Sequence, residues 1–185
     1  MPLTLESKFI EDARAGGDGL ERLISLVWPE AYRIALSILQ DRGLAEDAAQ
    51  DACVSIARSL AKLQNAKVFR SWSYRIIVNH AITTARRRPQ TQSLDTVSDE
   101  GVHFNDPQSL DLYNALARLP LRQRAAIVLH YYGGLNSKDI AGATGLPSST
   151  IRFHLMLARR ALREALSATQ TQAALSSKEI LSDVH

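Results

Sequence analysis

The sequence predicts an all-α protein of two small helical domains joined by a flexible linker. Apolar residues recur at helical spacing in two long stretches, strand signals are weak throughout, and a segment rich in Ser, Thr, Asp, Gln and Pro separates the two stretches. A chain of 185 residues can form one or two domains with modest cores. We expect a first domain at residues 1–90, a linker at 91–107, a second domain at 108–166 and a C-terminal tail at 167–185.

The first predicted domain opens with helices whose apolar residues repeat every three to four positions. A short helix is expected over Leu3–Ala15, before a pair of glycines. Apolar side chains from Leu20 to Ile38 mark the buried face of the next helix, which Pro29 is expected to kink or split. A further helix carries apolar residues from Ala45 to Leu63.

The last helix of this domain starts near Lys67. Its spacing predicts that Phe69, Trp72 and Ile76 are buried. It ends before Pro89, because proline disfavours helical geometry in the residue that precedes it.

The second predicted domain contains a helix-turn-helix pattern. Asn136 is a plausible N-cap for a short helix over Ser137–Ala143, Gly145–Pro147 form a tight turn, and Ser148 could cap a long last helix. Such a unit presents the N-terminal half of its second helix to the major groove of DNA. The polar side chains in that half are Ser148, Ser149, Thr150 and Arg152, with Arg159 further along.

The charges are distributed unevenly along the chain, although the net charge is only +3. Residues 61–90 contain lysines and arginines but no acid, residues 91–112 contain acids but no base, and bases exceed acids again from 113 onward. Two basic blocks separated by an acidic one indicate two surfaces that face polyanions.

Composition argues against several classes of function. The single cysteine, Cys53, rules out an internal disulfide and a cysteine-based zinc site. The histidines are scattered, and there is neither a glycine-rich phosphate loop nor a nucleophile elbow. We therefore expect no cofactor, no metal and no catalytic residue, and so not an enzyme. Without a long apolar run or a signal-peptide core, we expect a cytoplasmic protein with no membrane insertion.

Two sets of motifs resemble one known family. The segments AEDAAQDACVSIARSL and FRSWSYRIIVNHAITTARRR resemble region 2 of the bacterial extracytoplasmic-function (ECF) sigma factors, which belong to the sigma-70 family. The segment LARLPLRQRAAIVLHYYGGLNSKDIAGATGLPSSTIRFHLMLARRALREAL resembles their region 4, the promoter-reading helix-turn-helix. The resemblance covers roughly residues 15–166 in the family's order.

The resemblance implies a site for core RNA polymerase. Glu46, Asp47, Gln50 and Asp51 match the acidic helix that docks on the clamp of the polymerase's largest subunit. Where the family often has large aromatics, this helix has Cys53 and Ala57, so its core is either filled differently or packed more loosely.

The resemblance also implies contacts with promoter DNA. Melted −10 DNA would contact Trp72, Tyr74, Arg75, Asn79, His80, Arg86, Arg87 and Arg88. Trp72 fits the helix core better than a stacking role, whereas Tyr74 lies off the buried stripe and is the better stacking candidate. The −35 duplex would contact Ser148, Ser149, Thr150, Arg152, Phe153, His154 and Arg159.

The recognition helix departs from the family's usual polar and basic pattern. Phe153, Met156 and Leu157 should lie largely opposite its buried face. This strip could read thymine methyl groups, or it could dock against a partner such as an anti-sigma protein or against the other domain. We slightly favour the partner because Met and Leu are adaptable packing residues.

We therefore expect a sigma factor that binds core polymerase, recognises the −35 duplex and opens the −10 strands. The family further implies an anti-sigma partner that covers the polymerase-binding surfaces. The flexible linker would let the two domains be clamped together when inactive and spread along the promoter when active. Two alternatives are a sigma-like decoy that sequesters an anti-sigma factor and a stand-alone helix-turn-helix regulator. The basic −10 segment argues against the decoy, and the regulator leaves the N-terminal motifs unexplained.

Overall fold

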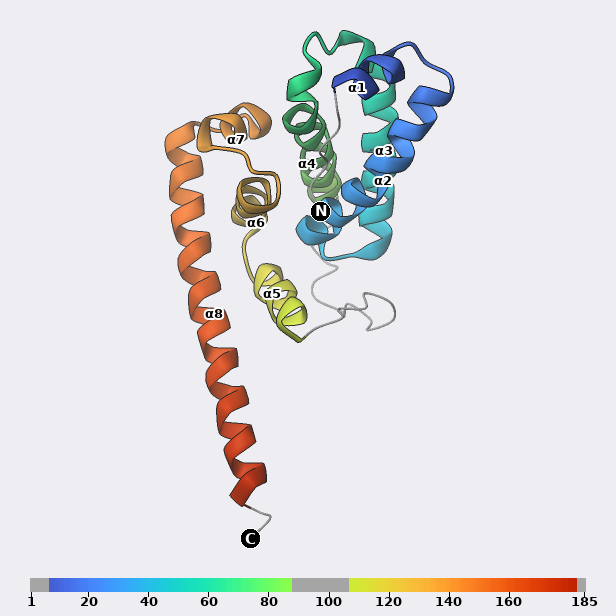
Figure 1. Ribbon diagram of the computed structural model, residues 1–185. Coiled ribbons are helices and arrows are strands. Elements are labelled where there is room, and N and C mark those ends of the chain that lie inside the picture. Colours follow the sequence, from blue (N-terminus) through green and yellow to red (C-terminus); the bar gives the residue numbers. More distant parts are fainter. Residues whose placement is uncertain (1–6, 88–106, 183–185) are drawn as a thin grey trace.

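The computed structural model describes residues 7–87 and 107–182, with side chains described in 7–87 and 109–168. Every regular element in these ranges is helical (Figure 1), which confirms the prediction of an all-α fold. The predicted linker lies outside the described residues except for Pro107, and so does Arg88.

The N-terminal group of helices runs to Arg87. Its members are α1 (Ser7–Arg14), α2 (Asp18–Leu39), α3 (Arg42–Ser59), the short turns η1 (Leu60–Lys62) and η2 (Ala66–Val68), and α4 (Phe69–Arg87). The side chain of Asp41 caps α3 by accepting a hydrogen bond from the backbone of Leu44 at 2.9 Å. Helices α2, α3 and α4 pack against one another, and α1 covers the start of α2.

Helix α2 is continuous through Pro29, so of the two predicted effects, a kink or a split, the split does not occur. Pro29 and Ser25, four residues earlier, are both exposed. The helical hydrogen bond that proline cannot donate is therefore lost on the solvent side, where water can replace it, while the opposite face stays packed.

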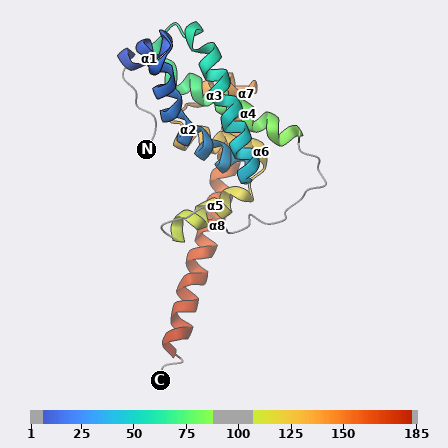
Figure 2. The same ribbon diagram turned by 90° about the vertical axis from the view of Figure 1, so that its right-hand side faces the viewer.

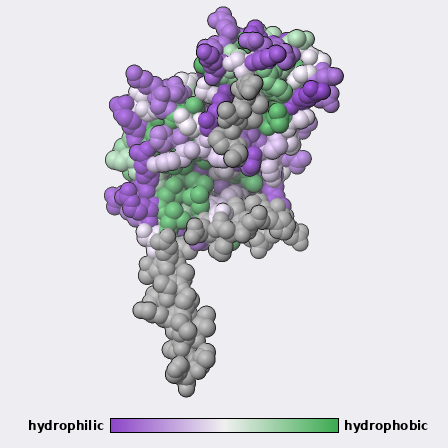
Figure 3. Space-filling model, viewed as in Figure 1, coloured by the Kyte–Doolittle hydropathy of each residue, from purple (hydrophilic) through white to green (hydrophobic). Residues whose placement is uncertain are grey.

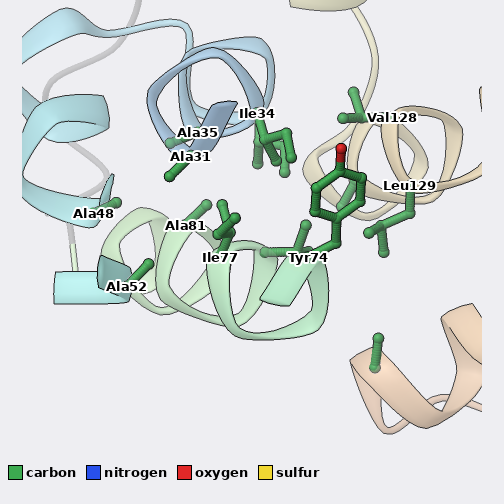
Figure 4. Close-up of a cluster of buried hydrophobic side chains, with 14 of the residues drawn as sticks. Ala31, Ile34, Ala35, Ala48, Ala52, Tyr74, Ile77, Ala81, Val128 and Leu129 are labelled. Carbon is green, nitrogen blue, oxygen red and sulfur yellow. The ribbon is translucent and has the colours of Figure 1, made fainter. Parts of the chain in front are cut away.

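Small side chains fill the interface between α2, α3 and α4 (Figure 4). Ala31, Ala35, Ala48, Ala52 and Ala81 are fully buried, and each leaves room for a neighbouring helix to come close. The core around α3 is therefore filled by small side chains instead of the large aromatics that are frequent in the family.

The buried face of α4 differs from the predicted one. Phe69 is buried as expected, but Trp72 and Ile76 are half-buried while Tyr74 and Ile77 have no exposed surface. The reason is that α4 packs on two sides, against α2 and α3 and also against α6 and α7 of the C-terminal half. Periodicity alone assumes a single buried side.

The C-terminal group begins at Pro107. It comprises α5 (Pro107–Ala117), α6 (Leu121–Ile127), the single π-helical turn η3 (Val128–Tyr132), α7 (Ser137–Thr144) and α8 (Ser148–Ser182). The predicted cap at Asn136 is confirmed, since its side chain accepts from the backbone of Lys138 and Asp139. Ser148 is the first helical residue of α8 instead of its cap, and the carbonyl of Pro147 accepts from the amide of Ile151 at 3.1 Å.

Helix α8 continues well beyond the predicted second domain. Residues of the predicted tail are helical as far as Ser182, and the C-terminal part of α8 projects away from the other helices (Figures 1 and 2). Its first turns are anchored on α5, α6 and α7 through Ile151, Leu155 and Ala158.

The two groups of helices pack against each other. Helix α2 contacts α5, α6 and η3, and α4 contacts α6 and α7. Side chains of both groups form one contiguous buried cluster, in which Tyr74 lies close to Val128 and Leu129 (Figure 4). Within the described residues no helix is both long and apolar enough to cross a membrane.

Candidate nucleic-acid interface

The predicted polymerase-binding residues form an exposed strip on α3. Glu46, Asp47, Gln50 and Asp51 are all exposed. Glu46 and Gln50 are four residues apart, as are Asp47 and Asp51, so the two pairs share one side of the helix. The opposite side is buried against α2 and α4 through alanines. Burial of that side therefore orients the acids outward.

A groove of about 380 Å³ lies between α3 and α4 next to this strip. Its lining consists of Asp51, Val54, Ser55 and Arg58 from α3 and Asn79, His80, Thr83, Thr84 and Arg87 from α4. The groove brings one predicted polymerase contact together with three predicted −10 contacts. Its two guanidinium groups, hydroxyls and amide suit a nucleotide phosphate and a base edge.

Ser55 orients His80 in this groove. The Ser55 hydroxyl and the Nε2 atom of His80 are hydrogen-bonded at 2.9 Å. Ser55, Arg58 and Thr84 also line the groove, although they are not among the site residues predicted from the sequence. These lining residues could have been predicted in part. Helices α3 and α4 are antiparallel neighbours, and Arg58 is a basic residue in a helix that carries the acidic strip.

The remaining −10 candidates are split between surface and core. Arg75, Asn79, Arg86 and Arg87 are exposed, as their predicted role requires. Trp72 is half-buried, with its ring 5.8 Å from the ring of Phe69. This position leaves part of the indole on the surface.

Tyr74 cannot stack on an unpaired base in this structure, which corrects the sequence-based expectation. Its side chain is fully buried and its hydroxyl donates a hydrogen bond to the carboxylate of Glu30 on α2. Glu30 itself is almost completely buried. A signal for it was present, since Glu30 stands at helical spacing between Val27 and Ile34 on the apolar face of α2.

The helix-turn-helix predicted from the sequence consists of α7, a turn and α8. Gly145 ends α7 with a φ of 71°, a conformation that favours glycine. Ser149 and Arg152 are exposed at the start of α8, whereas Ser148, Thr150 and His154 are half-buried.

The apolar strip of α8 faces outward in large part. Phe153 is 55% and Met156 54% exposed, as predicted, while Leu157 is half-buried. Figure 3 shows mainly hydrophilic residues along the first part of α8, with a larger hydrophobic area on the side toward the other helices. Successive helical residues are offset by about 100°, so Phe153 and Met156 share a side with Ser149 and Arg152.

Arg159 is held against η3. It donates to the Tyr131 hydroxyl at 3.0 Å and to Nε2 of His130 at 2.9 Å, and its guanidinium lies over the Tyr131 ring. Nδ1 of His130 lies 2.8 Å from the carbonyl of Leu135. Both His130 contacts are satisfied by the neutral tautomer that carries its proton on Nδ1.

The described residues contain no group of three or more His, Cys, Asp or Glu that could hold a metal ion. Cys53 is buried, and desolvation raises the pKa of its thiol to about 11. The thiol is therefore protonated and weakly nucleophilic at neutral pH.

Two family models match the chain in the order that the motifs suggest. The model described as Sigma-70 region 2 matches residues 23–90, and the model described as Sigma-70, region 4 matches residues 109–162. The ECF RNA polymerase sigma factor RpoE of Cereibacter sphaeroides is 30% identical over 131 residues, which cover 66% of this chain and 72% of that protein. The chain belongs to the ECF sigma factors of the sigma-70 family.

Another curated relative is also a sigma factor. RNA polymerase sigma factor SigV of Bacillus subtilis is 28% identical to this ECF sigma factor over 142 residues, covering 74% of this chain and 84% of SigV. Sigma factors are transcription regulators.

Two solved structures share the fold. RpoE of Bartonella quintana, crystallised with the anti-sigma factor NepR, superimposes with a TM-score of 0.69 at 23% identity over 82% of this chain and 98% of that one. CnrH in complex with the cytosolic domain of CnrY gives 0.62 at 20% identity, over 88% and 97%.

Proposed function

We propose that this ECF sigma factor binds core RNA polymerase through α3, holds the opened −10 strand on α4, and reads the −35 duplex with the N-terminal half of α8. The observation that carries the proposal is the α3–α4 groove. The groove lies between the exposed acidic strip of α3 and the polar residues of α4. One surface of the molecule can therefore contact both the polymerase and the DNA. In domain terms, residues 1–90 form region 2 and residues 108–166 form region 4.

Polymerase docking is supported by the charge of the strip on α3. Three carboxylates and the Gln50 amide are exposed on one side of a helix whose other side is fixed in the core. Such a strip is complementary to a basic helix of a partner and gives specificity through charge.

Capture of the −10 strand is supported by the chemistry of α4 and the groove. Asn79 and His80 offer donors and acceptors for a base edge, and Arg58 and Arg87 offer charge for phosphates. The partly exposed indole of Trp72 replaces Tyr74 as the stacking surface in this proposal.

Reading of the −35 duplex is supported by the exposed side of α8. Ser149 and Arg152 stand beside Phe153 and Met156 on this side. Arginine grips guanine bidentately and apolar groups contact the thymine methyl, so this mixture suits a major groove that contains both bases. For this reason we favour DNA, and not a protein partner, as what the apolar strip of α8 contacts.

We propose that an anti-sigma factor is the regulatory partner of this protein. We also propose that the protein acts in the cytoplasm, where RNA polymerase acts. Support comes from the structural likeness to RpoE, which was crystallised with the anti-sigma factor NepR.

Run-off transcription with purified core polymerase on genomic promoter fragments tests the proposal. Asp47→Lys should abolish both core binding and transcripts, whereas Glu11→Lys, which reverses an exposed acid on α1, should not. Asn79→Ala should keep core binding but reduce open complexes by roughly 10-fold, the effect of losing about 1–3 kcal/mol of base contact. Asn114→Ala, an exposed asparagine of α5, is its control.

Specific transcripts that are lost in Asp47→Lys and reduced in Asn79→Ala would support the proposal. A wild-type protein that neither binds core polymerase nor gives transcripts would overturn it and favour the decoy.

A further inference from the structure

A buried carboxylate lies where the two groups of helices meet. Glu30 on α2 is 1% exposed and accepts hydrogen bonds from the hydroxyls of Tyr74 on α4 and Tyr132 in η3, the latter at 2.9 Å. Arg33 donates to the same carboxylate at 3.1 Å. Because a buried charge is costly without partners, these donors are what allows Glu30 to occupy the core.

Two arginines add polar contacts across the same boundary. Arg70 on α4 donates to the carbonyl of Tyr132 at 3.2 Å. Arg124 on α6 donates to the carbonyl of Ile38 at the end of α2 at 2.8 Å. The chain passes very close to α4 here, since a Cβ atom at Gly133 would come within 3.0 Å of the Tyr74 ring.

This closed arrangement is incompatible with simultaneous binding of both promoter elements. The −35 and −10 elements lie about 25 base pairs apart, as their names state, which is roughly 85 Å of duplex at about 3.4 Å per base pair. In the structure α7 of the helix-turn-helix packs directly on α4, which is the −10 helix of the proposed function. The two groups must separate before both elements can be bound.

We propose that Glu30 and Tyr132, supported by Arg70 and Arg124, form an autoinhibitory latch that keeps the two groups of helices closed in the protein without polymerase. The proposal rests on the proposed function, because the inhibition concerns promoter binding. The apparent affinity for a complete promoter is reduced by the fraction of molecules that are open.

The partners of Glu30 explain why the latch can open. When the groups separate, Tyr132 leaves with the C-terminal group and its hydroxyl meets water. Tyr74 and Arg33 belong to the N-terminal group, so they stay with Glu30. Opening therefore leaves no buried charge without a partner, and the closed and open states differ by a few hydrogen bonds and the apolar contact area.

Distance measurements on Tyr132→Phe test the latch. This substitution removes the hydroxyl but keeps the ring, and Tyr32→Phe, a half-buried tyrosine on α2, is the matched control. Spin labels on Lys62→Cys and Lys138→Cys, both exposed and one in each group, report the separation in a Cys53→Ala background. Wild type and Tyr32→Phe should show a short distance, and Tyr132→Phe should raise the open-to-closed ratio roughly 10-fold, as expected for a hydrogen bond to a charged group.

Affinity for DNA gives a second readout. Tyr132→Phe should bind a forked fragment with both elements up to roughly 10-fold more tightly than wild type, with unchanged affinity for an isolated −35 duplex. Glu30→Gln, which keeps the shape of the side chain, should shift the distances in the same direction. Wild-type distances in both variants, with unfolding midpoints near that of wild type, would overturn the latch.

Failure of the proposed function is distinguishable from failure of the latch. The label distances are measured without DNA or polymerase, so they report closure even if the protein gives no transcript. A protein that initiates transcription but shows wild-type distances in both variants loses only the latch.

Discussion

At the scale of single residues, the least expected feature is the environment of Tyr132. Burial, followed by the hydrogen bond to Glu30 and the charge of that carboxylate, raises the pKa of Tyr132 far above the ordinary tyrosine value. A phenolate at this position would face the Glu30 carboxylate in a poorly solvated site. The neutral form is therefore part of the folded, closed structure.

Alkaline pH should destabilise the protein through this group. An unfolded tyrosine loses its proton near pH 10, and Tyr132 in the folded protein does so only at higher pH. The contribution of neutral Tyr132 to stability is thus complete below about pH 10 and is lost as the pH rises above it, by up to about 1.4 kcal/mol per pH unit. Denaturant titrations from pH 8 to 11 should show a steeper loss for wild type than for Tyr132→Phe, and parallel curves would contradict the assignment.

At the scale of the helices, capping and packing determine which side chains face outward. The Asn136 cap defines the start of α7, and Gly145 ends it just before α8 begins. Alanines on α2, α3 and α4 let these helices approach closely, and this fixes the direction of the acidic strip on α3. The orientation of each functional surface is therefore set by the buried side of the same helix.

Removal of the α7 cap should destabilise the protein measurably. Asn136→Ala leaves the amides of Lys138 and Asp139 without their acceptor and should lower the free energy of unfolding by about 1 kcal/mol. Asn114→Ala, which replaces an exposed asparagine within α5, should have little effect or a slightly stabilising one. Equal midpoints of urea unfolding for Asn136→Ala and wild type would show that the cap contributes nothing.

At the scale of the whole molecule, the two groups of helices behave as one packed body in this structure. Arg124 illustrates how they are joined, because it donates to the carbonyls of Ile38, Ala117 and Leu119. These three acceptors lie at or just beyond the ends of α2 and α5, so a single side chain connects two helix C-termini to α6. Desolvation lowers the pKa of Arg124 from its ordinary value, but arginine remains charged at any physiological pH.

Loss of this connection should reduce stability. Arg124→Ala removes three hydrogen bonds to helix ends and should lower the free energy of unfolding by about 2–3 kcal/mol. Arg122→Ala, at an exposed position two residues earlier, should change it by less than about 0.5 kcal/mol. Thermal unfolding followed by circular dichroism compares the two, and similar midpoints for both variants would refute the role of Arg124.

Features that depend on local chemistry and on the geometry of a single helix were predictable from the sequence. The all-α class, the Asn136 cap and the outward direction of Phe153 and Met156 follow from propensity and helical spacing, whereas the acidic strip from Glu46 to Asp51 was identified through the family resemblance. The family followed from two ordered sets of motifs, which matched region 2 and region 4.

Tertiary structure decided what depends on having neighbours on more than one side. Helical spacing identifies one buried face and so predicts that Tyr74 lies on the surface, whereas α4 is covered on two faces and Tyr74 is buried. The α3–α4 groove and the burial of Glu30 arise from contacts between residues far apart in the sequence. No local pattern encodes such contacts, because the energy of a buried polar group depends on donors that only the folded chain brings to it.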